Sequence, residues 1–213
     1  MTDDRPVHHP VFARVYRAIA RVAEGRGLAE HRAALLSGLS GTVLEVGAGD
    51  GANLRHYPSS VTRVVAVEPE ASLRARALEA ARSAPVPVTV VDAVADALPL
   101  TDGEADAVVL CLVLCSVPDP DQAAREVARV LRPGGEVRVL EHVAAAPGTR
   151  LRAVQERVDR WFWPRLFGGC HTARDPLGAL TAAGLSLAEE EHHRFPPGSA
   201  LPVSPHVRAR LTS

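Results

Sequence analysis

The sequence predicts an α/β protein with a doubly wound, mostly parallel, seven-stranded sheet and added N-terminal helices. Short apolar runs alternate with helix-like segments between residues 42 and 141, which is typical of β-α-β units. The run at 107–112 is apolar almost throughout, as expected for a strand buried on both faces. Polar and apolar residues alternate at 185–192 and 207–211, which predicts a final antiparallel pair.

Two helices are expected before the first strand. At 11–23 apolar residues recur at helical spacing with arginines on the opposite side, and Gly25 and Gly27 end the pattern. This helix could pack over the core or cofactor, or it could lie on a membrane surface with its arginine face toward lipid. The second helix is expected at 28–39, closed by Gly41.

The remaining elements follow from buried runs and from helix end signals. Asp119 is expected to cap a helix that has Pro120 at its first position. The other strands are expected at 42–46, 64–68, 86–91 and 136–141, and the other helices at 71–83, 120–131, 150–160 and 176–183. The chain then divides into an N-terminal helical cap at 1–40 and a core at 41–213, with an acceptor-site insert around 144–180.

Composition excludes several classes of protein. The 213 residues carry a net charge of −1, which leaves no electrostatic footprint for nucleic acid. Three cysteines do not make a disulfide framework and fit a reducing cytoplasm. The start is polar and no run approaches the ~18 apolar residues of a membrane span. We therefore expect a cytoplasmic protein whose membrane contact, if any, is peripheral and made through 11–23.

A glycine loop organises the chain. The first core strand runs into Gly47 and Gly49, which allow a tight turn and a close approach to a ligand. Glu45 lies just before the loop, and a second acid, Glu68, ends the next strand. A strand, a glycine loop and an acid about 20 residues on form a nucleoside-binding β-α-β unit, in which the acid holds ribose hydroxyls.

The spacing decides between nucleosides. The dinucleotide fingerprint is G-x-G-x-x-G, whereas this chain has G-x-G-x-G, and Glu45 would repel a pyrophosphate. A carboxylate suits a cationic ligand such as S-adenosyl-L-methionine (SAM). An ordinary strand–turn–helix with incidental glycines and a dinucleotide oxidoreductase remain the alternatives.

The residues at 44–51, Glu68 and the segment 131–135 resemble the class I SAM-dependent methyltransferases with their Rossmann-like fold. A narrower set of motifs, at 51–53, 112–117, 140–143 and 169–171, is similar to the methyltransferase-like thiol S-methyltransferases of animals and their bacterial relatives. Animal members begin with a hydrophobic membrane anchor, which this sequence does not show.

The resemblance implies a cofactor site. Glu45, Gly47 and Gly49 would line the methionine moiety, Glu68 the ribose, and Val94 and Ala95 the adenine. Many relatives have an Asp at the position of Val94, so a contact there would be apolar or made through backbone. The full set implied for SAM is Glu45, Gly47, Ala48, Gly49, Asn53, Glu68, Pro69, Val94, Ala95, Cys111 and Leu112.

Two histidines are the candidates for a base or an acceptor-positioning group. His142 follows a strand that ends at the site, and His171 lies on a Gly-Gly-Cys-His turn. Either could instead be structural. The three cysteines lack C-x₂-C spacing, so no metal site is expected. The aromatic segment 161–167 is either core or one wall of an acceptor pocket.

These observations predict SAM-dependent methyl transfer to a small, largely apolar acceptor, most simply a thiol sulfur. N-methylation of a lipid amine such as phosphatidylethanolamine, and O-methylation of a natural product, are the alternatives within the class. A nucleoside-binding protein without turnover is the alternative from another class.

Overall fold

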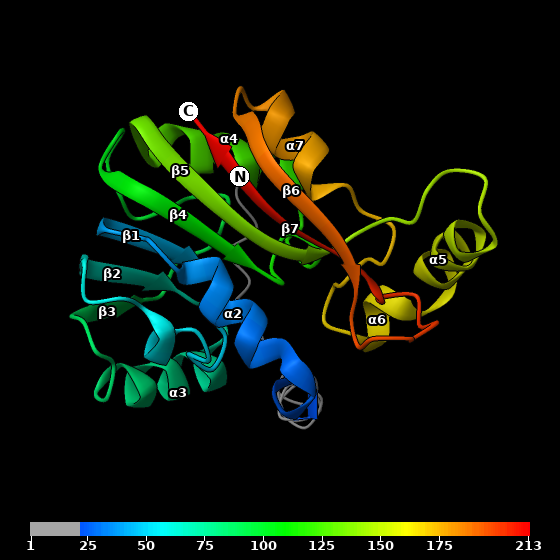
Figure 1. The fold of residues 1–213 in the computed structure, drawn as a ribbon, viewed down its shortest axis with the longest axis horizontal. Coiled ribbons are helices and arrows are strands. Elements are labelled where there is room, and N and C mark those ends of the chain that lie inside the picture. Colours follow the sequence, from blue (N-terminus) through cyan, green and yellow to red (C-terminus); the bar gives the residue numbers. More distant parts are fainter. Residues whose placement is uncertain (1–21) are drawn as a thin grey trace.

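The structure is a computed structural model that describes residues 22–213. The helix expected at 11–23 therefore lies outside the described residues except for its last two positions. The sheet has seven strands in the order β3-β2-β1-β4-β5-β7-β6, and β7 runs antiparallel to both of its neighbours. This confirms the doubly wound, mostly parallel fold (Figure 1). The strands are β1 Gly41–Val46, β2 Val61–Val67, β3 Val88–Val91, β4 Ala105–Cys111, β5 Leu131–His142, β6 Ser186–Arg194 and β7 Pro205–Thr212.

Helices cover both faces of the sheet. One face packs on α4 (Pro120–Val130) and α7 (Pro176–Ala182), and the other packs on α2 (Ala29–Leu36). The short η2 (Leu54–His56) and the longer α3 (Ala71–Ala81) also lie on the α2 side. Figure 1 shows the remaining pair, α5 and α6, projecting away from the end of the sheet at the right. Their bounds are Arg150–Trp161 and Trp163–Leu166.

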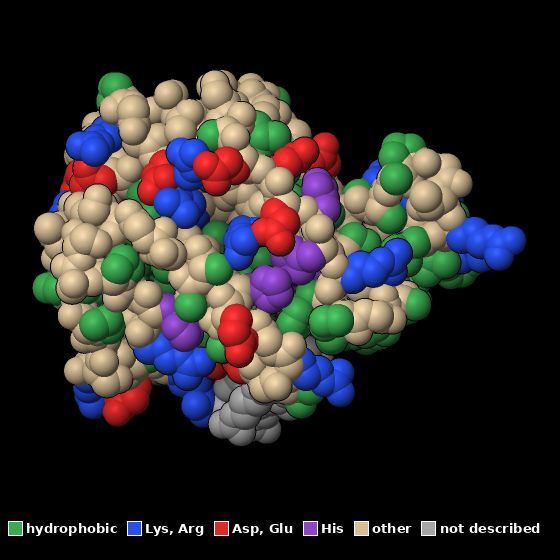
Figure 2. Space-filling view, in the orientation of Figure 1, with side chains coloured by type: hydrophobic (Ala, Val, Ile, Leu, Met, Phe, Trp, Pro, Cys, Tyr) green, Lys and Arg blue, Asp and Glu red, His purple; other side chains and the backbone are tan. Residues whose placement is uncertain are grey.

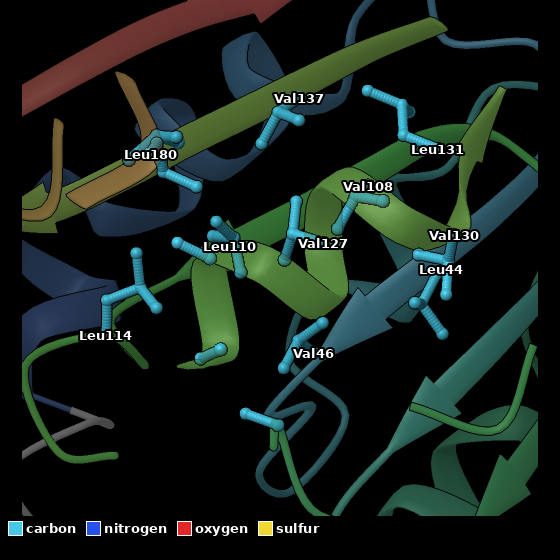
Figure 3. Close-up of a cluster of buried hydrophobic side chains, with 14 of the residues drawn as sticks. Leu44, Val46, Val108, Leu110, Leu114, Val127, Val130, Leu131, Val137 and Leu180 are labelled. Carbon is cyan, nitrogen blue, oxygen red and sulfur yellow. The ribbon is translucent and has the colours of Figure 1, made fainter. Parts of the chain in front are cut away.

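The larger core lies between the sheet and α4. Leu44 and Val108 face Val127 across this layer, all of them fully or almost fully buried (Figure 3). The strands contribute Val and Leu at alternate positions because successive side chains point to opposite faces. Asp119 accepts hydrogen bonds from the backbone N–H groups of Asp121 and Gln122, which confirms the predicted cap of α4.

Element ends differ from the sequence predictions at glycines. Gly27 interrupts the helix as predicted, since its φ of 109° is non-helical and makes a kink, but the π-helical turn Glu24–Leu28 continues directly into α2. The helix ends at Leu36 rather than residue 39, because Gly38 takes the left-handed conformation just after it. No helix within residues 22–213 is long and apolar enough to cross a bilayer.

Strand β5 is longer than expected. It begins at Leu131, which pairs with Ala105 ahead of a register irregularity. The turn at residues 132–135 had suggested a later start. Pairing between Leu131 and Ala105 extends the strand across this turn, so α4 ends one residue earlier than predicted, at Val130.

Candidate active site

The glycine loop lies at the carboxyl edge of the sheet, directly after β1. Gly47 and Gly49 have φ angles of 69° and 59°, a conformation that side chains rarely adopt. A Cβ at Gly47 would lie 2.9 Å from Val113 Cβ. Glycine is thus needed at position 47 for two reasons: the positive φ angle and the close approach of Val113, which follows β4.

Glu68 connects the loop to the end of β2. It is buried, and its two carboxylate oxygens accept hydrogen bonds from the backbone N–H groups of Gly49 at 2.8 Å and Glu70 at 2.9 Å. Burial raises the pKa of Glu68, and the two backbone donors act in the opposite direction. Each oxygen keeps a free lone pair, so the anchored carboxylate can still accept from a pair of hydroxyls, as a ribose presents. Pro69 follows directly and its carbonyl accepts from the Arg74 guanidinium.

Glu45 lies at the centre of a buried polar network on the α2 side of the sheet. Its carboxylate oxygens accept hydrogen bonds from Asn53 Nδ2 at 2.9 Å and from the Tyr57 hydroxyl at 2.8 Å. Burial raises the pKa of Glu45, while these two donors lower it. The contact of Glu45 with the cofactor stays a prediction; in the structure both oxygens have partners within the protein.

Arg32 ties the N-terminal helix to this network. Its Nη1 donates to Asn53 Oδ1 at 2.9 Å and to Cys111 Sγ at 3.1 Å, and its Nε pairs with Glu24 at 2.8 Å. No sequence motif points to Arg32 or Tyr57 as site residues. An arginine buried on an otherwise amphipathic helix is visible only once that helix is packed on the strand ends.

The end of β4 is strained. Leu112 has φ 57°, the one non-glycine residue with positive φ in the described part of the chain. Such strain is typical of functional positions, and it turns the backbone after Cys111 toward the glycine loop. The Cys111 thiol is buried, which raises its pKa to about 11, so it is not a nucleophile.

The loop after β3 supplies the residues expected beside adenine. Val94 is 40% exposed whereas Ala95 is buried. Asp96, which the sequence analysis did not single out, has a buried Oδ1 without a hydrogen-bond partner among residues 22–213. An orphaned acceptor at this edge of the sheet suits an amine donor such as that of adenine.

The side chains of His142 and His171 make different contacts. His142 is buried, and its Nε2 is 3.2 Å from Cys170 Sγ. Burial alone would lower the pKa of His142, but the bond to Cys170 raises it. His171 instead turns toward Asp159, with its Nδ1 3.8 Å from Oδ2. Only His142 of the two points into the group of buried polar residues at the carboxyl edge.

Glu141 fixes the loop after β4 through hydrogen bonds to its backbone. Its Oε1 accepts from the backbone N–H groups of Val113 at 2.6 Å and Leu114 at 2.9 Å. Burial raises the pKa of Glu141 to about 7. One carboxylate thus positions the segment that also closes over Gly47.

The aromatic segment is not core beneath the C-terminal pair. Trp161 is 72% exposed and Leu166 64%, because α5 and α6 project from the sheet. Trp163 stacks on Phe167 with ring centroids 4.2 Å apart. The pKa of the Cys170 thiol is lowered to about 5, chiefly by Cys115 and then by His142, with a smaller contribution from Trp163. Trp163 is thus the member of the segment that reaches the site.

Comparison with known proteins agrees with this architecture. Residues 44–139 match the methyltransferase domain family. The chain is 37% identical over 169 residues to human thiol S-methyltransferase TMT1A, covering 78% of this chain and 68% of that protein. It is 36% identical to human thiol S-methyltransferase TMT1B, covering 82% and 72%. It is also 34% identical over 131 residues to a phosphatidylethanolamine N-methyltransferase of Cereibacter sphaeroides, covering 61% and 64%.

Solved structures share the fold at low identity. A SAM-dependent methyltransferase from Thermotoga maritima, described as a possible histamine N-methyltransferase, superposes with TM-score 0.65 at 21% identity, covering 95% of this chain and 98% of that one. A geranyl diphosphate C-methyltransferase from Streptomyces coelicolor, in complex with S-adenosyl-L-homocysteine, has TM-score 0.65 at 16% identity, covering 87% and 76%.

The residues present fit SAM as the cofactor. The anchored carboxylate of Glu68, the positive-φ glycine loop and the orphaned Asp96 oxygen fit the sugar, the methionine moiety and the base in turn. When bound, SAM supplies an electrophilic methyl group on a sulfonium. From its fold, its glycine loop and its relatives, the chain belongs to the class I SAM-dependent methyltransferases.

Proposed function

We propose that this methyltransferase methylates the sulfur of a small, largely apolar thiol. The observation that carries the proposal is the similarity to thiol S-methyltransferase TMT1A, which extends over 78% of the chain. The buried His142 beside Cys170 supports it, because a site that already accommodates a thiol next to an imidazole suits a sulfur acceptor.

The chain's own residues have three tasks. Glu68 fixes the ribose, and the backbone of Gly47, Gly49 and Leu112 holds the methionine moiety. Asp96 accepts from the adenine amine. Positioning two reactants in this way contributes up to ~7–11 kcal/mol in favourable reactions. A thiol of pKa about 8.5 needs only a modest base or a nearby positive charge, and His142 is the group placed to provide it.

A product screen tests this proposal. Methyl-labelled SAM is incubated with the protein and a panel of thiols, amines and phenols, and the products are identified by mass spectrometry. We expect labelled thioethers, and none with Glu68→Ala, which removes the ribose acceptor. Labelled amines or phenols with no thioether would refute the thiol assignment.

The second candidate is N-methylation of a lipid amine. It is favoured by the similarity to the phosphatidylethanolamine N-methyltransferase of Cereibacter sphaeroides. It requires contact with a membrane, for which residues 11–23 are the candidate, within an otherwise cytoplasmic protein. Co-sedimentation with phosphatidylethanolamine vesicles, with and without residues 1–26, tests it. Binding that is lost on truncation would support the lipid substrate, and no binding by either form would exclude it.

A further inference from the structure

Three soft ligands from separate segments meet at the carboxyl edge of the sheet. Cys115 lies in the turn after β4, His142 ends β5, and Cys170 follows α6. Their ligand atoms, Sγ, a ring nitrogen and Sγ, all lie within 4.8 Å of one another. Cys115 and His142 are buried and Cys170 is half-buried. No local spacing motif predicts this cluster, because its three residues come together only in the folded chain.

The distances are close to what a tetrahedral metal needs. Zinc binds thiolate sulfur at about 2.3 Å and imidazole nitrogen at about 2.0–2.1 Å, which places neighbouring ligand atoms roughly 3.3–3.8 Å apart. The separation of His142 Nε2 from Cys170 Sγ is 3.2 Å. Small side-chain rotations would bring the three atoms to one ion. A set of two thiolates and one imidazole selects Zn²⁺ among the common divalent cations and leaves one position open.

The surroundings favour a dication. As ligands of an ion both cysteines would be thiolates, and the buried carboxyl group of Glu141 lies directly behind them. One positive charge faces them, that of Arg174, whose guanidinium is held by the carbonyls of Leu114 and Val117 at 2.7 Å and 2.6 Å. A divalent ion would neutralise the two thiolates that bind it. Within residues 22–213, His142 Nδ1 and Glu141 Oε2 have no hydrogen-bond partner.

The cluster also lies next to the cofactor loop. Val113 packs against Gly47, and its N–H donates to Glu141, the residue before His142. Backbone contacts reinforce the arrangement, since the His171 N–H donates to the Cys115 carbonyl at 2.8 Å. An acceptor held at the cluster would therefore stand close to a methyl group held over Gly47.

We propose that Cys115, His142 and Cys170 bind Zn²⁺, and that its open position receives the acceptor thiol. The second part rests on the proposed function. With the ion bound, His142 would serve as its ligand and the ion would supply the positive charge, so the thiol would lose its proton to solvent on binding. A lone pair of the bound thiolate forms the new carbon–sulfur bond while the donor's methyl–sulfur bond breaks. The electron pair of that bond stays on S-adenosyl-L-homocysteine, and the neutral thioether leaves the metal.

Cobalt substitution tests the ion site without relying on activity. Protein stripped with a chelator is titrated with Co²⁺, and thiolate-to-cobalt charge-transfer and tetrahedral d–d absorption bands are recorded. We expect one equivalent to bind. Cys170→Ser should lower the affinity by more than the about 10–100-fold that loss of an outer-shell partner costs, and Cys115→Ser should act likewise. Cys111→Ser is the matched control, because this buried thiol lies outside the cluster.

Circular dichroism and thermal unfolding verify that each variant is folded. Absence of the bands in wild-type protein, or bands of equal strength in folded Cys170→Ser, would overturn the site. Addition of a small alkyl thiol should change the d–d bands, and unchanged bands would overturn the role as acceptor site. Thiol methylation without any cobalt signature would refute this inference alone. Cobalt binding without thiol methylation would refute the proposed function and leave the ion site intact.

Discussion

Removing the hydroxyl of Tyr57 tests whether the buried network of Glu45 stabilises the fold. Tyr57 and Glu45 are each only 2% exposed, and the hydroxyl donates to Glu45 Oε2 at 2.8 Å. In Tyr57→Phe water cannot easily replace this donor. A lost hydrogen bond to a buried charged group costs about 1.5–3 kcal/mol. For a chain of this size, about 2 kcal/mol corresponds to a decrease in Tm of about 4–8 °C.

The assay is urea unfolding followed by circular dichroism, at several pH values. Burial raises the pKa of Glu45, and the Tyr57 bond opposes that effect by favouring the charged form. Without the hydroxyl the pKa should rise further. The difference in stability between wild type and Tyr57→Phe should therefore be largest at high pH and narrow on acidification through the Glu45 pKa. A variant as stable as wild type, or a gap that widens in acid, would refute the reasoning.

Three further outcomes are expected. Glu68→Gln keeps the side-chain shape but loses the negative charge that accepts from the ribose hydroxyls. The affinity for SAM, measured by calorimetry, should fall about tenfold to 100-fold. An unchanged affinity would contradict the ribose role of Glu68. Gly47→Ala should lower the free energy of unfolding in denaturant titration by about 1–3 kcal/mol. The double variant Gly47→Ala/Val113→Ala should recover part of this loss, and no recovery would show that the dihedral angle alone is responsible. Burial lowers the pKa of His206 to about 4 from 6.5, so its contribution is complete above pH 6.5 and is lost as pH falls toward 4. The free energy of unfolding should then change less between pH 7.5 and pH 5 in His206→Gln than in wild type, by up to ~2 kcal/mol. An equal change in the two proteins would exclude this cause.

The inner strands β1, β2 and β4 could be predicted because each contains a buried run between turn residues, whereas the exposed β6 was predicted from its alternation alone. The apolar stretch at 107–112 permits little else, and β4 covers most of it. Helix ends were harder to predict where several glycines lie near one end of a helix. Gly25, Gly27 and Gly38 all lie near α2, and tertiary packing decides that Gly27 makes a kink while Gly38 ends the helix.

The candidate site shows the same division. Residues at the ends of parallel strands, such as Glu68 and His142, could be predicted because the fold class alone brings strand ends to one edge. Cys115 and Cys170 could not be paired in advance, since their meeting depends on where α6 returns to the sheet. The contacts between histidines could not be predicted from the sequence either. His31 stacks on His193 with ring centroids 4.3 Å apart. Figure 2 shows histidine side chains gathered near the middle of this face.

The guanidinium of Arg32 has a consequence for recombining this protein with its relatives. It joins α2 to η1 through Glu24, to the segment after β1 through Asn53, and to the end of β4 through Cys111. A chimera that exchanged only η1 and α2 would either leave the buried Arg32 without its partners in the core or leave Asn53 without Arg32. These positions should therefore be transplanted as one unit, and crossover points placed inside the network should yield fewer folded hybrids than points placed in the turn before β2.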